Sequence, residues 1–213
     1  MTGYIALEGP IAVGKTTLVE RLRERVGADA VLDIPDNPFL ADFYKEVPAA
    51  AFKAQMYFLV SRFQQQVELA RASSAKALIV SDYLFARDKI FAYLNLDDQE
   101  ILIYDKYFAA LSPHAAVPDL VVYLKAPLEV LVERLRRRNV EYEARIAEGY
   151  IEELIKAYDH FFYHYTESPL LIVNTAEIDF VQDESDLRAL IQRITGGKVK
   201  GVEYYHPIRR KRK

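Results

Sequence analysis

The chain has 213 residues, 51% of them hydrophobic and 28% charged, which is the balance of a water-soluble globular protein with a sizeable core. Its formal net charge of −3 argues against a surface that recruits nucleic acid, and the lack of cysteine excludes disulfides, thiolate catalysis and cysteine-based zinc sites. No apolar run approaches the length of a membrane span and no signal peptide precedes the first predicted strand, so we expect a cytoplasmic protein with no membrane partner.

Five short apolar runs, separated by helical patterns, predict the strands of a parallel sheet. They are Tyr4–Leu7, Ala30–Leu32, Ala77–Val80, Leu120–Leu124 and Leu170–Val173. The alternation of strands and helices predicts a three-layer α/β fold, a five-stranded parallel sheet with helices on both faces. Ligands of such folds bind beyond the carboxyl ends of the strands, so the chemistry should follow these runs.

The segment after the first predicted strand fits the phosphate-binding pattern G-x-x-x-x-G-K-[ST]. It consists of Gly9, Pro10, Ile11, Ala12, Val13, Gly14, Lys15, Thr16 and Thr17. A strand precedes it and a helical pattern follows, and this context lets several backbone N–H groups surround a phosphate at the positive end of a helix. We therefore predict a P-loop, with Lys15 on the terminal phosphates and the Thr16 hydroxyl on Mg²⁺.

Two aspartates follow the second predicted strand. Asp33 stands at the carboxyl end of the strand, and Asp36 stands in a turn that contains two prolines. A carboxylate in this region can act as a general base, or it can cap the helix that follows. The strand-end position favours a functional role for Asp33, whereas Asp36 or Asn37 could cap the helix, and for Asp36 we favour the cap.

A long helix is predicted from Ala49 to Ala72, with mostly apolar residues that belong to the core. Gln55 and Arg62 are polar and seven residues apart, so they lie on nearly the same face of this helix. Taken by themselves, residues of this kind are more often found on the surface.

The third predicted strand ends in Ser81-Asp82, which has the form of a Walker B motif. A carboxylate at this place contacts Mg²⁺ or one of its water ligands. The segment from Tyr83 to Leu111 then carries two helical patterns and many aromatic residues, which favours a role in the core.

An arginine-rich helix is predicted from Glu129 to Arg138. Arg134 and Arg138 are four residues apart and share one face. They either stabilise a transferring phosphoryl group or form a solvated charge cluster. A lid-like turn at Asn139 should separate this helix from the next one, and a final helix is predicted from Glu184 to Ile194.

No repeat or linker divides the chain. We expect one P-loop domain over residues 1–195 and a basic tail over residues 196–213, which ends in Arg209-Arg210-Lys211-Arg212-Lys213. Such a tail is typically disordered and solvated.

Several of these stretches, in the same order, resemble the deoxyribonucleoside kinase family, which includes deoxycytidine, deoxyguanosine and deoxyadenosine kinases. The resemblance covers about residues 3 to 194, and its last part is similar to bacterial members. It is carried by Glu8-Gly9-Pro10…Gly14-Lys15-Thr16-Thr17, Asn37-Pro38-Phe39-Leu40…Phe43-Tyr44, Gln55…Ser61-Arg62, Ser81-Asp82-Tyr83…Phe91-Ala92, Pro118-Asp119-Leu120…Tyr123-Leu124, Glu133-Arg134…Arg138…Glu143 and Ser168-Pro169-Leu170-Leu171…Asn174-Thr175…Ile178-Asp179-Phe180.

The resemblance implies an enzyme that transfers the γ-phosphoryl group of ATP to the 5′-hydroxyl of a deoxynucleoside. It also implies the five-stranded sheet predicted above and a homodimer built on a helix bundle. On this basis Gly9 to Thr17 bind ATP, and Asp33 takes the proton of the 5′-hydroxyl. Asp82 is the Mg²⁺-associated carboxylate, and Arg134 and Arg138 are lid arginines.

The resemblance also places residues around the acceptor. Tyr44 and Glu143 match the pair that hydrogen-bonds the 3′-hydroxyl, and Gln55 matches the residue that pairs with the base edge. Arg62 and Asp88 match a charged pair that reads the polar groups of the base. Such a pair rejects the wrong base by leaving polar groups unpaired, so we expect adenine, guanine or cytosine rather than thymine, with deoxyadenosine favoured.

Three positions depart from the family pattern. Asp33 is one methylene shorter than the usual glutamate base. Tyr83 replaces an arginine that steadies the carboxylate acting as the general base. We still expect Tyr83 to be one of the acceptor-site residues. Val140 stands where another lid arginine is common.

Two other functions remain open. One is a nucleoside monophosphate kinase such as thymidylate kinase, which would need a site for the acceptor phosphate. The other is a nucleotide-binding protein that does not turn over, because the three departures bear on the chemistry. Both alternative functions retain the nucleotide-binding P-loop. They differ in the molecule that would bind at the acceptor site.

Overall fold

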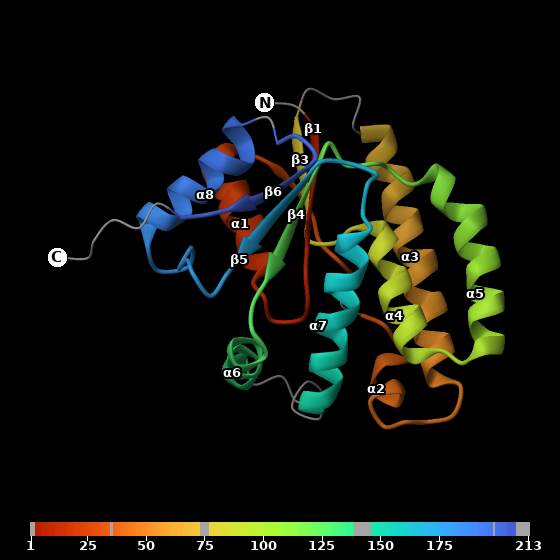
Figure 1. Cartoon of the computed structure of the whole chain (residues 1–213). Coiled ribbons are helices and arrows are strands. Elements are labelled where there is room, and N and C mark those ends of the chain that lie inside the picture. Colours follow the sequence, from red (N-terminus) through yellow and green to blue (C-terminus); the bar gives the residue numbers. More distant parts are fainter. Residues whose placement is uncertain (1–2, 35, 73–76, 139–145, 198, 208–213) are drawn as a thin grey trace.

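The computed structural model describes residues 3–34, 36–72, 77–138, 146–197 and 199–207. Over this part of the chain, strands and helices alternate (Figure 1). The helices are α1 (Lys15–Val26), α2 (Leu40–Phe43), α3 (Ala50–Ala72), α4 (Asp88–Asn95), α5 (Asp98–Leu111), α6 (Leu128–Arg138), α7 (Glu148–Tyr163) and α8 (Glu184–Gly196), with short 3₁₀ turns η1 (Phe85–Arg87) and η2 (Ser112–His114).

The strands form a parallel sheet, and the described chain contributes six of them rather than the five predicted. Their order is β2-β3-β1-β4-β5-β6. They are β1 (Gly3–Glu8), β2 (Asp29–Val31), β3 (Leu78–Ser81), β4 (Leu120–Lys125), β5 (Leu170–Asn174) and β6 (Val202–Tyr205).

The strand missing from the prediction is β6, which lies within the segment 196–213 expected to be a tail. It pairs with β5 alone, with Leu170 opposite Val202, and its residues alternate between exposed and half-buried. A continuous apolar run identifies a strand that is buried on both faces, and an edge strand has no need of one. The structure confirms all five predicted strands, with bounds that differ by one residue at an end; β1, β3, β4 and β5 lie inside the sheet, and β2 forms its other edge.

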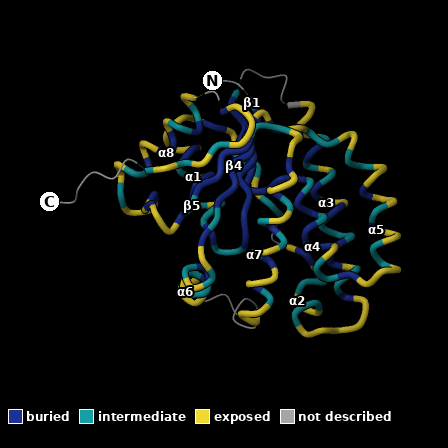
Figure 2. The backbone as a smooth tube through the Cα atoms, in the orientation of Figure 1, coloured by how far each residue is buried: buried dark blue, intermediate teal, exposed yellow. Residues whose placement is uncertain are grey.

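Alternate strand residues belong to different cores, which is why helices cover both faces. Ile5 and Leu7 of β1 pack with α1, α6 and α8, whereas Tyr4 and Ala6 pack with α3, α4 and α7. Most residues of the central strands are buried, and the dark blue tube in the middle of Figure 2 marks them. Burial on this scale supplies the main driving force for forming the three layers.

A third cluster joins α3, α4 and α5 outside the layer that covers the sheet. It contains Leu59, Phe85, Ala92, Leu96, Tyr104 and Phe108. Phe85 and Phe108 stack with ring centroids 5.4 Å apart, which fixes α5 against η1. Helix α5 therefore forms the outer edge of the molecule in Figure 1.

The carboxyl ends of three neighbouring strands bring the predicted chemistry to one edge of the sheet. The P-loop follows β1, Asp33 lies two residues beyond β2, and Asp82 follows β3. Because β2, β3 and β1 are adjacent, these segments lie side by side although they are far apart in the sequence.

Two local expectations have different outcomes. The turn before α2 is closed by Asn37, whose Oδ1 accepts from the Phe39 N–H at 3.0 Å, and no side-chain cap from Asp36 is present at the start of α2. Asn37 is the better placed residue because its amide also donates to the Ala54 carbonyl of α3 at 2.9 Å. The lid-like turn with Asn139, Val140 and Glu143 lies outside the described residues.

Candidate active site

The P-loop is a tight turn that only glycine permits at its first position. Gly9 has φ of 150°, and a Cβ there would lie 2.1 Å from the backbone oxygen of Leu124. Gly14 has φ of 107° and stands immediately before α1. The loop therefore ends on the N-terminus of a helix, where unpaired backbone N–H groups favour an anion.

The lysine of this loop is held by the backbone that it helps to shape. Lys15 Nζ donates to the Gly9 carbonyl at 2.7 Å and to the Pro10 carbonyl at 3.2 Å. Burial lowers the pKa of Lys15 to about 8, against the opposing attraction of the Glu8 carboxylate. These two hydrogen bonds hold the Lys15 ammonium group at the P-loop, where the phosphate oxygens of a bound nucleotide would lie.

A cavity of about 310 Å³ opens beside the loop. Its size suits a nucleoside-like small molecule. Eight of the predicted site residues line it: Ile11, Lys15, Thr16, Asp33, Tyr44, Gln55, Arg62 and Asp82. The side chains of Phe58, Phe91, Tyr150 and Leu154 complete the lining.

Two side chains that carry oxygen atoms, Thr16 and Asp82, meet where the P-loop faces the end of β3. The Thr16 hydroxyl donates to Asp82 Oδ2 at 2.6 Å, and Asp82 Oδ1 accepts from the Asp33 N–H at 2.6 Å. The hydroxyl and carboxylate expected to hold Mg²⁺ are therefore adjacent, and the same carboxylate fixes the backbone that carries Asp33. Oxygen ligands of this kind are the ones Mg²⁺ prefers.

Two guanidinium groups hold the Asp33 carboxylate. Arg62 Nε and Nη2 form a bidentate pair with Asp33 Oδ1 and Oδ2, each at 2.9 Å, and Arg87 Nη2 donates to Oδ2 as well. Burial alone would raise the pKa of Asp33, but Arg62 and Arg87 hold that pKa well below its usual range. About a quarter of the side chain, 24%, remains exposed, so a ligand in the cavity can reach it.

The base-reading residues predicted on α3 are organised by one buried carboxylate. Asp88 accepts from Gln55 Nε2 at 2.7 Å, from the Tyr104 hydroxyl at 2.9 Å and from Arg62 Nη1. Burial raises the pKa of Asp88, while Arg62 opposes the rise. Asp88 itself lies behind the cavity wall, and it orients the two side chains that form the wall.

Tyr83, Arg134 and Arg138 also lie outside the cavity lining. Tyr83 is fully buried, and its hydroxyl accepts from Gln66 Nε2 at 3.1 Å. Arg134 donates to the Thr175 hydroxyl at 2.8 Å and to the Val13 carbonyl at 3.2 Å, so it braces the back of the P-loop. Arg138 is exposed at the end of α6.

Sequence reasoning assigned no role to Glu8, Arg87 and Tyr158, which the structure places in the same network. Glu8 is fully buried and accepts from the Gly9 N–H and the Leu84 N–H at 2.8 Å each, and from the Tyr158 hydroxyl at 3.0 Å. The sequence feature that could have indicated a role for Glu8 is its position, because it is a charged residue at the end of a buried strand. For Arg87 the signal was its place beside Asp88 in an otherwise aromatic segment.

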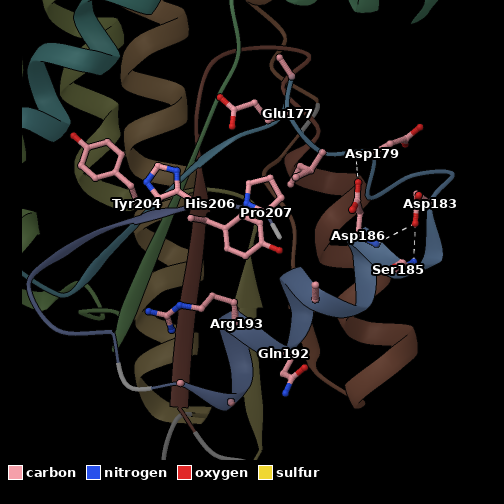
Figure 3. A pocket seen from close by; sticks show the side chains of 16 residues that line it. Glu177, Asp179, Asp183, Ser185, Asp186, Gln192, Arg193, Tyr204, His206 and Pro207 are labelled. Atoms are coloured by element: carbon pink, nitrogen blue, oxygen red, sulfur yellow. Dashed lines mark hydrogen bonds between the residues drawn. The ribbon is translucent and has the colours of Figure 1, made fainter. Parts of the chain in front are cut away.

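A larger hollow of about 1530 Å³ lies between α8, β6 and the segment after β5 (Figure 3). Two of its acidic side chains accept hydrogen bonds from the backbone. Asp183 Oδ1 accepts from the Ser185 N–H at 2.8 Å, and Asp186 Oδ2 accepts from the Asp179 N–H at 2.9 Å. None of the predicted site residues lines it. We therefore place the candidate active site at the smaller cavity beside the P-loop.

The chain is similar to known deoxynucleoside kinases over nearly its whole length. The model of the family "deoxynucleoside kinase" matches residues 5–197. A deoxyguanosine kinase of Bacillus subtilis is 31% identical over 197 residues, which cover 90% of this chain and 95% of the relative. A deoxyadenosine kinase of Dictyostelium discoideum is 34% identical over 186 residues, 85% of this chain and 75% of the relative.

The fold has a solved counterpart as well. The structure of deoxyadenosine kinase from M. mycoides with bound dATP superimposes with a TM-score of 0.77 at 23% sequence identity, and the match covers 90% of this chain and 98% of that one. The family match, the similarity to two curated kinases and the P-loop beside a nucleoside-sized cavity agree with one another. The chain belongs to the deoxynucleoside kinase family.

Proposed function

We propose that this deoxynucleoside kinase uses ATP to phosphorylate the 5′-hydroxyl of a deoxynucleoside whose base carries an exocyclic amino group. One observation carries the proposal: Lys15 of the P-loop and Asp33 line the same cavity. A donor phosphate on Lys15 and an acceptor hydroxyl on Asp33 would then meet inside this cavity. Holding two reactants in this way accounts for much of the catalysis of phosphoryl transfer.

The choice of base is argued from the orientation of one amide group. Gln55 Nε2 donates to Asp88 Oδ2 at 2.7 Å and to the Asp88 carbonyl at 3.0 Å. Both partners are acceptors, so the amide nitrogen must face them and the amide oxygen is left for a ligand. An acceptor at this place suits the amino group of adenine or cytosine, and deoxyadenosine is our first choice.

Arg62 completes the base-reading wall and tightens the discrimination. Three of its five N–H groups are used by Asp33 and Asp88, and the guanidinium stacks on Phe58 at 4.4 Å. Thymine would place its O4 acceptor where Gln55 offers no amide donor. A buried polar group left unpaired costs about 1–3 kcal/mol, which supports rejection of thymidine.

Asp33 would act mainly by orienting the acceptor hydroxyl. Because its pKa lies well below the usual range, this carboxylate is a weak base that stays ionised throughout the neutral range. Phosphoryl transfer has a loose transition state and needs little proton removal before the bond to phosphorus forms. A weak base that accepts the proton late is compatible with this chemistry.

Thr16 and Asp82 fit the Mg²⁺ that the family's use of ATP implies. Their oxygen atoms lie 2.6 Å apart at the end of the P-loop, which agrees with the few protein ligands that Mg²⁺ takes beside phosphate oxygens. When bound there, the ion supplies neutralisation of phosphate charge. Tyr44 lies on the cavity wall and is proposed to hold the 3′-hydroxyl with Glu143, which is outside the described residues.

A homodimer is proposed through the outer face of α4 and α5. Leu102, Tyr107 and Ile103 of α5 and Tyr93 of α4 are exposed by 65%, 54%, 45% and 54%. Large apolar side chains left exposed on neighbouring helices are typical of an interface between subunits. The far side of α3 and α4 faces the cavity, so a partner on this face would leave the active site open.

The function is tested by measuring ADP release from Mg·ATP with each of the four deoxynucleosides and with dTMP. We expect release with deoxyadenosine above all, weaker release with deoxycytidine or deoxyguanosine, and none with thymidine. The variant Gln55→Glu, which keeps an acceptor but adds charge beside Asp88, should lower turnover of deoxyadenosine. Gln99→Glu, the same change at an exposed glutamine of α5, is the matched control.

The same assay decides among the alternatives. ADP release with dTMP alone would identify a nucleoside monophosphate kinase. Binding of ATP without release in the presence of any acceptor would identify a nucleotide-binding protein. Turnover of thymidine at the rate of deoxyadenosine would refute the role given to the Gln55 amide.

A further inference from the structure

One buried guanidinium, that of Arg87, contacts the carboxylates of both halves of the site. Its Nη2 donates to Asp33 Oδ2 on the acceptor side, and its Nη1 donates to Glu8 Oε1 at 3.3 Å beside the P-loop. The side chain is only 5% exposed. We propose that Arg87 is a positioning residue for the phosphoryl transfer, one that fixes Asp33 in the orientation needed to receive the acceptor hydroxyl.

This inference rests on the proposed function and extends it to a residue at an unexpected position. The family pattern has an arginine at position 83 to steady the base, and here Tyr83 is buried with its hydroxyl bonded to Gln66. The 3₁₀ turn η1 brings the chain round so that Arg87, four residues later, points back to Asp33. The Arg87 guanidinium thus reaches the Asp33 carboxylate from the 3₁₀ turn that follows position 83.

Arg87 and Arg62 hold Asp33 from two different elements. Arg62 belongs to α3 and is shared with Asp88, so by itself it would tie Asp33 to the base-reading side. Arg87 ends η1 and engages Oδ2 from the P-loop side. Two fixed donors on one carboxylate restrict its rotation, and misplacement of a reacting group by about 1 Å can cost about 100-fold in rate.

The other end of Arg87 is anchored by Glu8, a fully buried carboxylate. Glu8 has no exposed surface, and its oxygens also accept from the Gly9 N–H, the Leu84 N–H and the Tyr158 hydroxyl. Burial acts to lower the pKa of Arg87, but Glu8 and Asp33 hold it well above its ordinary value. Arg87 therefore remains charged, and the loop that binds the donor and the carboxylate that meets the acceptor share one rigid support.

A double-mutant cycle between Arg87 and Asp33 separates positioning from support of the fold. Arg87→Met keeps an unbranched, mostly aliphatic side chain and removes the guanidinium charge, and Asp33→Asn keeps the shape of the carboxylate. For Arg87→Met we expect kcat to fall by about 10- to 100-fold while KM for ATP changes by less than about threefold. In the Asp33→Asn background the same substitution should change kcat by less than about twofold, because its target is already lost.

Other results of the cycle would overturn the proposal. Losses that multiply in the double variant mean that Arg87 does not act through Asp33. A rise in KM for ATP with unchanged kcat means that it only supports the P-loop through Glu8. Wild-type kcat in Arg87→Met with a lowered Tm means that its role is confined to stability.

A second variant keeps the test decisive if Arg87→Met does not fold. Arg87→Lys retains the charge between Glu8 and Asp33, and we expect it to recover at least about a third of wild-type kcat. A loss in Arg87→Lys that persists in the Asp33→Asn background refutes the positioning role. Failure of the wild-type chain to turn over any deoxynucleoside refutes the proposed function instead, so the two failures are distinguishable.

Discussion

At the scale of single residues, the pKa values of Lys15 and Asp33 are both lowered, for different physical reasons. Burial lowers the pKa of Lys15 to about 8, whereas Arg62 and Arg87 outweigh burial at Asp33 and hold its pKa well below the usual range. A carboxylate with a depressed pKa contributes stability that is present above its unfolded pKa and is lost as the pH falls through the folded value. Asp33 therefore introduces no acid limb near neutral pH, and the titration that matters for donor binding is that of Lys15.

We predict that binding of ATP weakens in mildly alkaline solution. Below about pH 8 the ammonium of Lys15 is charged and attracts phosphate, and above it the group loses its proton. If the charged form is the one that binds, the apparent Kd for Mg·ATP should rise by about tenfold between about pH 7 and about pH 9. Calorimetric titration in buffers of different ionisation enthalpy should also detect proton uptake on binding near pH 8.

The control for this prediction is a lysine variant. Lys15→Arg keeps its charge over the whole pH range. This variant should bind Mg·ATP more weakly than the wild type, but its Kd should not change with pH. A wild-type Kd that does not change up to about pH 9, with no proton uptake, would show that Lys15 is charged throughout in the free protein.

At the scale of single elements, the P-loop depends on glycine at one position where the backbone leaves no room. We predict that Gly9→Ala lowers the free energy of unfolding by about 2–4 kcal/mol, because its Cβ would meet the Leu124 carbonyl. Denaturant unfolding measures this loss. It should be accompanied by loss of ATP binding, since the loop cannot keep its turn.

A matched glycine distinguishes this clash from a general effect of alanine. Gly149 lies near the start of α7, is exposed, and has nothing within 4 Å of an added Cβ. Gly149→Ala should therefore stabilise the protein by about 0.5–1 kcal/mol through helix propensity. Equal destabilisation by the two substitutions would contradict the steric argument.

Helix α5 begins with a complete capping box, which predicts a stability effect without an effect on catalysis. Asp97 Oδ1 accepts from the Gln99 N–H and the Glu100 N–H at 2.9 Å each, and the Glu100 side chain accepts from the Asp97 N–H at 3.2 Å. Asp97→Ala should cost about 1 kcal/mol of stability in a denaturation experiment. Gln99→Ala, at an exposed neighbour, should change stability by less than about 0.5 kcal/mol, and kcat should be unaffected in both.

At the scale of the whole molecule, the exposed apolar face of α4 and α5 predicts the assembly. Leu102 is the most exposed member of this face, at 65%. We predict that the wild-type protein sediments as a dimer and that Leu102→Glu sediments as a monomer, because a charge in an apolar interface is not compensated. Val181→Glu, at an exposed apolar residue remote from α5, should remain dimeric.

The unfolding of the Leu102→Glu variant should also lose the dependence on protein concentration that a dimer shows. A wild-type protein that sediments as a monomer at all concentrations would refute this interface. A dimer that survives Leu102→Glu would place the interface on another face.

The sequence by itself determined the elements whose evidence is local. The P-loop is a contiguous pattern, the five predicted strands are continuous apolar runs, and strand ends placed Asp33 and Asp82 at one edge of the sheet. Strands buried on both faces and turns that bind phosphate leave a signature within a few residues. The deoxynucleoside kinase assignment followed from the order of such signatures and was confirmed.

Only the tertiary structure decided which side chains meet. One of the two guanidinium groups beside Asp33 comes from Arg87, 54 residues away, and Arg134 donates to Thr175, 41 residues away. Asp88 lies behind Gln55 rather than on the cavity wall. The sixth strand likewise exists because β5 offers it a free edge. Contacts of this kind depend on how distant segments pack, and no periodicity along the chain records them.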